Sequence, residues 1–124
     1  MSKKRIENYI KPALQAIENS FESKKKIPSE YNGYISSFGA SLIQSGLKPT
    51  LALFENESSD SKGEKKKLTD IILNILAPKS NECSLLAYVQ TQDEVLMKEL
   101  IIDISIAVKL SLRTFELGKG GNNE

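Results

Sequence analysis

The chain has 124 residues, of which 17 are Lys or Arg and 16 are Asp or Glu, so its net charge at pH 7 is +1. This balance argues against a protein that binds through bulk positive charge, and the length suits one domain. There is no His, no Trp and a single Cys, Cys83. These absences remove the usual base of nucleophilic triads, the commonest metal ligand, an internal disulfide and a thiolate zinc site. We expect a soluble cytoplasmic domain.

The first segment with helical periodicity has apolar residues three and four positions apart. Pro12 lies inside this pattern, so we expect either a kink near residues 8–12 or a helix that starts later. Lys24, Lys25 and Lys26 follow the pattern, and three cations after a helix are typical of its C-terminal end. The stripe consists of Ile6, Ile10, Leu14, Ile17 and Phe21.

Ser29, after Pro28, is the predicted N-cap of a second helix that runs to Gly46. Gly33 and Gly39 inside it each cost about 1 kcal/mol relative to Ala. We therefore expect another backbone to approach them closely, either from a neighbouring helix or from a partner chain.

Gly46 followed by an apolar Leu47 is typical of a left-handed C-terminal cap. The segment PTLALFEN, which begins at Pro49, predicts a short third helix that is buried nearly all round. Residues 56–66 are polar and Ser-rich, which predicts a mobile loop. A fourth helix is predicted from Lys67 to just before Pro78, because the apolar residues between them keep helical spacing.

A short fifth helix is predicted after residue 80 or 81. Thr91 and Glu94 form a capping-box pattern before the last helix, which is expected from about Gln92 to Leu117, where Gly118 ends it. This helix is apolar on several sides and is the expected centre of the fold. Its predicted stripe and flank consist of Leu96, Met97, Leu100, Ile101, Ile102, Ile104, Ile106, Ala107, Val108, Leu110, Leu112 and Phe115.

The expected fold class is therefore all-α, a single bundle of about six helices around a long central C-terminal helix. The domain is expected to span residues 1–117. Residues 118–124 have nothing to bury and are expected to form a disordered tail.

Charge is separated along the chain. The net charge is +4 over residues 1–26, −3 over 27–61, +3 over 62–79 and −3 over 80–124. Such separation can create a basic stripe for phosphates on an otherwise acidic surface. The alternative is that the lysine clusters at 24–26 and 65–67 are only solvated helix ends.

Lys109 and Arg113 lie four residues apart on the last helix. Like charges at this spacing cost a few tenths of a kcal/mol, which an anionic partner would relieve. Alternatively, Arg113 pairs with an internal carboxylate, either Glu116 or Asp103.

Other chemistry is weakly indicated. Glu99 and Asp103 share a helical face and could hold Mg²⁺, but two carboxylates are fewer ligands than a dedicated site needs, so no metal ligand is predicted. Tyr31 and Tyr34 could stack on bases, although beside Phe38 they are more typical of a core edge. The chain has no P-loop, GxGxxG, HExxH or GxSxG motif. A helix-turn-helix over residues 29–56 would lack base-reading side chains in PTLALF.

Three segments together resemble the small helical subunit of the type III-B, or Cmr, CRISPR effector complex. They are IENYIKPALQAI, YNGYISSFGASLIQSGLKPTLALF and AVKLSLRTFEL, and the resemblance spans about residues 3–117. The second and third of these segments carry the specificity. The matching positions are Gly39, Gly46, Leu47, Pro49, Thr50, Lys109, Leu110, Arg113, Thr114 and Phe115.

The resemblance implies a non-catalytic protein without a cofactor, present in several copies that stack along the crRNA-bearing backbone and help form the groove for target RNA in antiviral defence. The implied partners are the backbone and large subunits, further copies of the chain, and crRNA or target RNA through the backbone, with no membrane. Two alternatives remain: a stand-alone helical nucleic-acid-binding regulator, and a metal-dependent nuclease built on Glu99 and Asp103. From charge, the candidate RNA contacts are Lys24, Lys25, Lys26, Lys48, Lys65, Lys66, Lys67, Lys109 and Arg113.

Overall fold

The computed structural model of the chain describes residues 3–21, 30–55 and 64–123, with the side chains of residues 3–21, 30–55 and 65–114. Within these ranges the secondary structure is six helices without strands, which confirms the all-α prediction. The helices are α1 (Lys3–Ser20), α2 (Glu30–Ser45), α3 (Leu47–Phe54), α4 (Glu64–Leu76), α5 (Leu85–Val89) and α6 (Glu94–Asn123).

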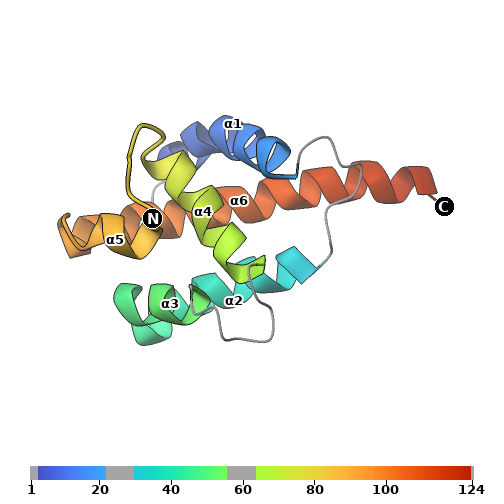
Figure 1. Cartoon of the computed structure of the whole chain (residues 1–124). Helices are drawn as coiled ribbons and strands as arrows, with labels where there is room; N and C mark the ends of the chain where they lie inside the picture. The colour runs from blue at the N-terminus through green and yellow to red at the C-terminus, as the bar shows by residue number, and fades with distance from the viewer. Residues whose placement is uncertain (1–2, 22–29, 56–63, 124) are drawn as a thin grey trace.

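Helix α6 is the central element of the bundle. It contacts α1, α2 and α4, and Figure 1 shows α1 above it, α2 and α3 below it, and α4 crossing in front. Burial on several sides of α6 explains its apolar composition and confirms the prediction that the last helix is central. Its buried residues are Met97, Ile101, Asp103, Ile104, Ser105, Ala107, Val108, Ser111 and Leu112.

The start of α6 differs from the prediction. Asp93 Oδ1 accepts a hydrogen bond from Val95 N at 3.1 Å, and the Asp93 carbonyl accepts one from Met97 N at 2.9 Å. Asp93 is therefore the N-cap, since its side chain satisfies a donor of the first turn. Thr91 Oγ1 instead donates to the Tyr88 carbonyl at 2.9 Å. The capping box of Thr91 with Glu94 is wrong because the cap lies two residues later.

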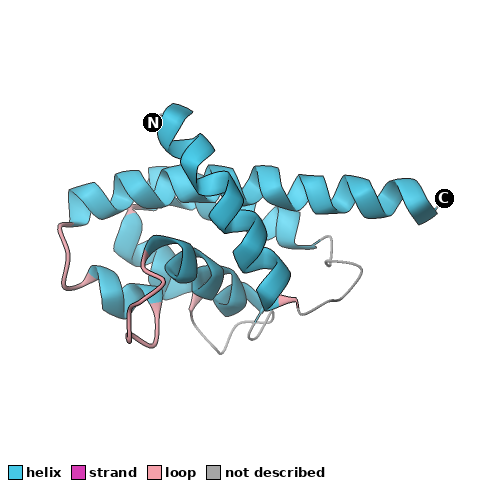
Figure 2. Cartoon of the chain, turned by 90° about the horizontal axis from the view of Figure 1, so that it is seen from above, coloured by secondary structure: helices cyan, strands magenta, loops and turns pink. Residues whose placement is uncertain are grey.

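The other end of α6 also differs. The helix continues through Gly118 to Asn123, so the helix end predicted at Leu117 is wrong. Figures 1 and 2 both show the last turns projecting beyond the other helices. Phe115 is a predicted core residue, but its side chain is not among those that the structure describes.

Helix α1 is continuous from Lys3 to Ser20, with Pro12 inside it. The later start suggested by Pro12 is therefore wrong. Pro12 is exposed, whereas Ala13 and Ile17 are fully buried. The apolar face thus lies against the core while the proline ring faces outward, where a weakened backbone ladder can be solvated.

The turn from α2 to α3 depends on Gly46. Its φ of 97° confirms the positive φ expected of a glycine cap. Its ψ of 173° is extended rather than left-handed helical, a region open essentially to glycine alone. Across this turn the hydroxyls of Ser41 and Thr50 are hydrogen-bonded at 2.6 Å, and Leu47 is buried. These contacts join α2 to α3, which begins two residues before Pro49.

One expectation about α3 is wrong, and for Gly33 one of the two expected alternatives is wrong. Helix α3 is not buried all round, because Leu53 is 55% exposed. Gly33 does not lie against another helix of the chain: a Cβ built there meets no described atom within 4 Å. Gly39 faces α6, where such a Cβ would lie 3.9 Å from Ser105 Oγ, which is ordinary contact rather than close packing.

Helices α4 and α5 lie where the sequence predicts them, and the start of α4 differs from the prediction. Helix α4 ends at Leu76, before Pro78 as predicted, but begins at Glu64, three residues before the predicted start at Lys67. The predicted N-cap Ser29 and residues 56–63 lie outside the described residues. No helix in the described ranges is long and apolar enough to span a bilayer.

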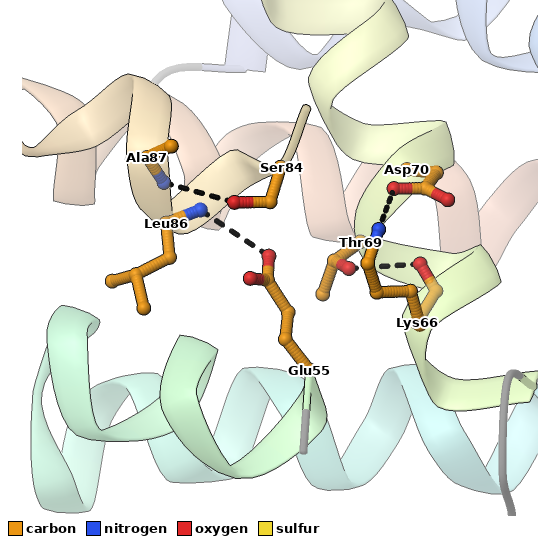
Figure 3. A network of polar contacts seen from close by, with 7 residues as sticks. All are labelled: Glu55, Lys66, Thr69, Asp70, Ser84, Leu86 and Ala87. Carbon is orange, nitrogen blue, oxygen red and sulfur yellow. Dashed lines mark hydrogen bonds and ion pairs between the residues drawn. The ribbon is translucent and has the colours of Figure 1, made fainter. Parts of the chain in front are cut away.

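Helix α5 is joined to α3 at its N-terminus. Ser84 Oγ accepts from Ala87 N at 3.1 Å, and Glu55 Oε2 accepts from Leu86 N at 3.2 Å (Figure 3). Both acceptors satisfy free donors of the first turn of α5. A carboxylate after α3 thus fixes the start of a helix 31 positions later.

Candidate nucleic-acid interface

The described candidate cations lie in three places. Lys65, Lys66 and Lys67, called here the α4 lysines, lie in the first turn of α4, and Lys48 lies at the start of α3. Lys109 and Arg113, called here the α6 cations, lie on α6. Residues 24–26, with the other three candidate lysines, lie outside the described residues.

Lys65 joins α4 to two other helices. Its Nζ lies 5.5 Å from the centre of the Phe54 ring on α3 and 5.9 Å from that of Tyr34 on α2. An ammonium over an aromatic face is attracted by the ring quadrupole. Because a ring carries no net charge, neither ring offsets the charge of the ammonium group.

Lys67 contacts the end of α1. Its Nζ lies 4.8 Å from the Phe21 ring centre and donates to the Ser20 carbonyl at 3.3 Å. That carbonyl is at the C-terminus of α1, the negative end of the helix dipole, which favours a cation. The dipole and the ring thus stabilise Lys67 without an opposing formal charge.

Lys66 is the member of the α4 lysines with a carboxylate partner. Its Nζ lies 2.9 Å from Asp70 Oδ1, one turn along α4 (Figure 3). Partial burial lowers the pKa of Lys66, but the hydrogen bond to Asp70 and the charge of Asp70 outweigh it, so the pKa is raised overall. The first turn of α4 thus holds three lysines together with Glu64 at the positive end of the helix dipole, and the charges of Asp70 and Glu55 both act on Lys66.

The tyrosines of α2 have separate environments. Tyr31 is 3% exposed and contacts the Phe21 ring edge-to-face at 5.0 Å and the Tyr34 ring at 5.3 Å. A ring buried in this way cannot stack on a base, so Tyr31 belongs to the core edge. Tyr34 is half-buried and lies beneath Lys65.

Lys48 lies beside the first residue of α6. Its Nζ is 3.7 Å from Glu94 Oε1, and the two side chains are 46% and 52% exposed. An ion pair as exposed as this one contributes at most about 1 kcal/mol. Lys48 can therefore exchange Glu94 for another anion at little cost.

The α6 cations are both exposed. Arg113 does not pair with Asp103, because Asp103 Oδ2 is bonded to Arg5 Nε of α1 at 2.5 Å. The other suggested partner, Glu116, lies outside the described side chains. The hydrogen bond to Asp103 raises the pKa of Arg5, and the nearby charges of Asp103 and Glu99 act in the same direction.

The Arg5–Asp103 pair was missed by sequence reasoning. Asp103 is completely buried, whereas the Arg5 side chain is 34% exposed. The available signal was a carboxylate between Ile102 and Ile104 in an apolar stripe, since a buried charge requires a partner. Nothing in the spacing identified Arg5, which lies 98 positions earlier.

The structure gives the two carboxylates of the metal hypothesis different environments. Glu99 is exposed, whereas Asp103 is buried and held by Arg5. Among the described side chains, no three Cys, Asp or Glu residues gather closely enough to hold a metal ion. A guanidinium occupies the place that a cation would take at Asp103.

The family comparison covers most of the chain. Residues 5–106 match the family model described as CRISPR-associated protein (Cas_Cmr5). The chain belongs to the Cmr5 family. It is a CRISPR-associated small subunit of the type III-B, or Cmr, system, which confirms the resemblance of its sequence. No curated protein and no solved structure matches the chain.

The match places the candidate cations in two groups. The α4 lysines and Lys48 lie within the matched residues, and the α6 cations lie beyond residue 106. Family membership therefore rests on α1 to α5 and the first half of α6. The roles of Lys109 and Arg113 have to be argued from their own geometry.

Proposed function

We propose that this Cmr subunit is non-catalytic, is present in several copies beside the crRNA-bearing backbone, and helps form the groove that receives target RNA. Three observations support a non-catalytic role: the sequence has no His, its one Cys is exposed Cys83, and Asp103 is buried against Arg5. These leave little of the usual acid–base and nucleophilic chemistry.

The exposed α6 cations are the observation that carries the RNA contact. Their side chains point away from the core one helical turn apart, where they repel each other. Phosphate groups of an RNA strand would relieve that repulsion and replace it with attraction. The α4 lysines and Lys48 are secondary candidates, because they already hold rings, a carbonyl or carboxylates of their own chain.

Repetition explains how a nearly neutral protein contributes to RNA binding. A few phosphate contacts on one chain give only weak, salt-dependent affinity, of the order of 10⁻⁴ to 10⁻⁶ M. When several copies are held along one RNA, each contact raises the effective concentration for the next. The sequence of the target would then be read by base pairing with the guide rather than by this subunit.

The test is target-RNA binding by the complex reconstituted with wild-type subunit or with the K109E/R113E variant. If each cation contacts a phosphate in each copy, the plot of log affinity against log salt becomes shallower by about 1.4 to 1.8 per copy. Affinity at low salt falls in parallel. The variant should be as helical as the wild type, because both side chains are exposed.

The matched control is K11E/K79E, which makes the same change of charge at two exposed lysines outside the candidate set. It should leave the salt dependence unchanged. An equal loss in the control would mean that only the overall charge matters. Unchanged binding by K109E/R113E would mean that the α6 cations do not contact the RNA. Tight RNA binding by the isolated chain at physiological salt would instead support the stand-alone regulator.

A further inference from the structure

One face of α6 carries exposed residues at both ends and two half-buried isoleucines between them, of which Ile102 also packs against the core. Val95 is 70% exposed, and the charged members of this face are also exposed. Spacings of four and three alternate along the face, as in the contact line of a two-helix coiled coil. Its members are Val95, Glu99, Ile102, Ile106, Lys109 and Arg113.

The order of residue types on this face is complementary to itself. The anion Glu99 lies toward the N-terminus, the α6 cations lie toward the C-terminus, and two isoleucines lie between them. A two-fold rotation centred beside Ile104 exchanges positions equally far from it along the helix. It therefore places residue 99 against 109, 102 against 106, and 95 against 113 of a second copy.

We propose that the free protein forms an antiparallel, two-fold symmetric dimer through this face of α6. Ile102 packs on Ile106 of the second copy at the centre, and the reciprocal contact repeats it. Glu99 meets Lys109 of the second copy on both sides of the axis. Val95 packs under the aliphatic stem of the second copy's Arg113.

Charge excludes the parallel arrangement of the same two helices. A parallel pair would place Glu99 against Glu99 and Lys109 against Lys109, which is repulsive at both positions. The antiparallel pair turns both into attraction. The face thus specifies the orientation of the pair as well as providing its apolar centre.

The length of the face sets the expected strength. From Val95 to Arg113 the helix rises by about 27 Å. One helix face of this length buries less area than a standard stable interface. We therefore expect a weak dimer that forms as concentration rises. This inference does not rest on the proposed function, because a two-fold pair closes at two copies whereas a stack along RNA does not. It buries the α6 cations, so the free dimer and RNA contact through them would exclude each other.

The test is sedimentation velocity of the full chain at low salt, from about 10 µM to 1 mM. The wild type should move from monomer toward dimer and stop there. E99K and K109E should each weaken the dimer by about tenfold, because two attractive contacts become repulsive. The double variant E99K/K109E should restore it, and so should an equal mixture of the two single variants.

K79E is the matched charge control and should dimerise as the wild type does. Circular dichroism of each variant separates loss of dimer from loss of fold. A wild type that stays monomeric throughout would refute the proposal, and so would assembly that continues beyond two. Single reversals without effect would also refute it, as would a double variant as weak as its parents.

Discussion

The central position of α6 is tested by truncating one leucine of a neighbouring pair. Leu112 is 3% exposed, whereas Leu110, two residues earlier on the same helix, is 43% exposed. Leu→Ala removes the same atoms at both positions. A difference in the free energy of unfolding therefore reports the surroundings rather than the side chain.

The magnitude follows from burial. Losing three buried carbon groups at about 0.8 kcal/mol each costs about 2.4 kcal/mol at Leu112. A cavity of up to about 100 Å³ adds up to about 2.4 kcal/mol, so the total is about 2.4 to 5 kcal/mol. At Leu110 nearly half of the surface is already in water and no cavity forms, so the expected cost is about 1 kcal/mol.

Urea unfolding followed by circular dichroism measures both variants. Leu112→Ala should shift the midpoint clearly, while the slope of the unfolding free energy against urea stays that of the wild type. Leu110→Ala should shift it only slightly. Equal shifts for the two variants, or an unchanged midpoint for Leu112→Ala, would refute the placement of α6 at the centre of the bundle.

Three further predictions concern pH, capping and the end of α6. Burial raises the pKa of Tyr9 above 10.0, so its protonated form stabilises the fold below that value and the contribution is lost as pH rises through the folded pKa. Tyr9→Phe should therefore lose less stability than the wild type between about pH 9 and 12, and parallel curves would contradict this. Asp93→Ala should cost about 1 kcal/mol in urea unfolding and Thr91→Ala under about 0.5 kcal/mol; the reverse order would restore the capping box. Because the end of α6 projects beyond the bundle and is rich in glycine, amides after Gly118 should exchange with solvent much faster than those near Ile104, and equal protection would show that these last turns do not fray.

Helix positions were predictable because apolar spacing repeats at 3.6 residues. All six predicted helices are present, and the differences between prediction and structure lie mainly at the helix ends. Thr91 fits a capping box as well as Asp93 fits a simple cap, and only the position of the backbone decides between them. Likewise, Pro12 predicts a break that an exposed position in a long helix does not require.

Surfaces were harder to predict than helices. Leu96 and Leu110 fit the apolar pattern of α6 but are 45% and 43% exposed, because none of the described elements covers them fully. Gly33 predicts close packing, yet within the described chain it has open space around it. Periodicity shows which residues share a face, but it does not show which faces receive a neighbour.

Pairings between distant residues were the least predictable part of the candidate site. The sequence indicates that Asp103 needs a partner, but the choice of Arg5 depends on how α1 crosses α6. The α4 lysines form one cluster in the sequence. Their partners are three rings, a carbonyl and a carboxylate. The carboxylate, Asp70, lies on α4 itself, whereas the rings and the carbonyl come from α2, α3 and the end of α1 and are brought together only in three dimensions.

Affinity purification of the tagged protein from its native cells, with identification of the proteins and small RNAs that accompany it, tests the proposed function most directly. Recovery of crRNAs with larger Cmr subunits, at more than one copy of this chain per complex, is the predicted result. Recovery of the chain alone or as its own dimer, free of RNA and of other subunits, would contradict its role in an RNA-guided complex.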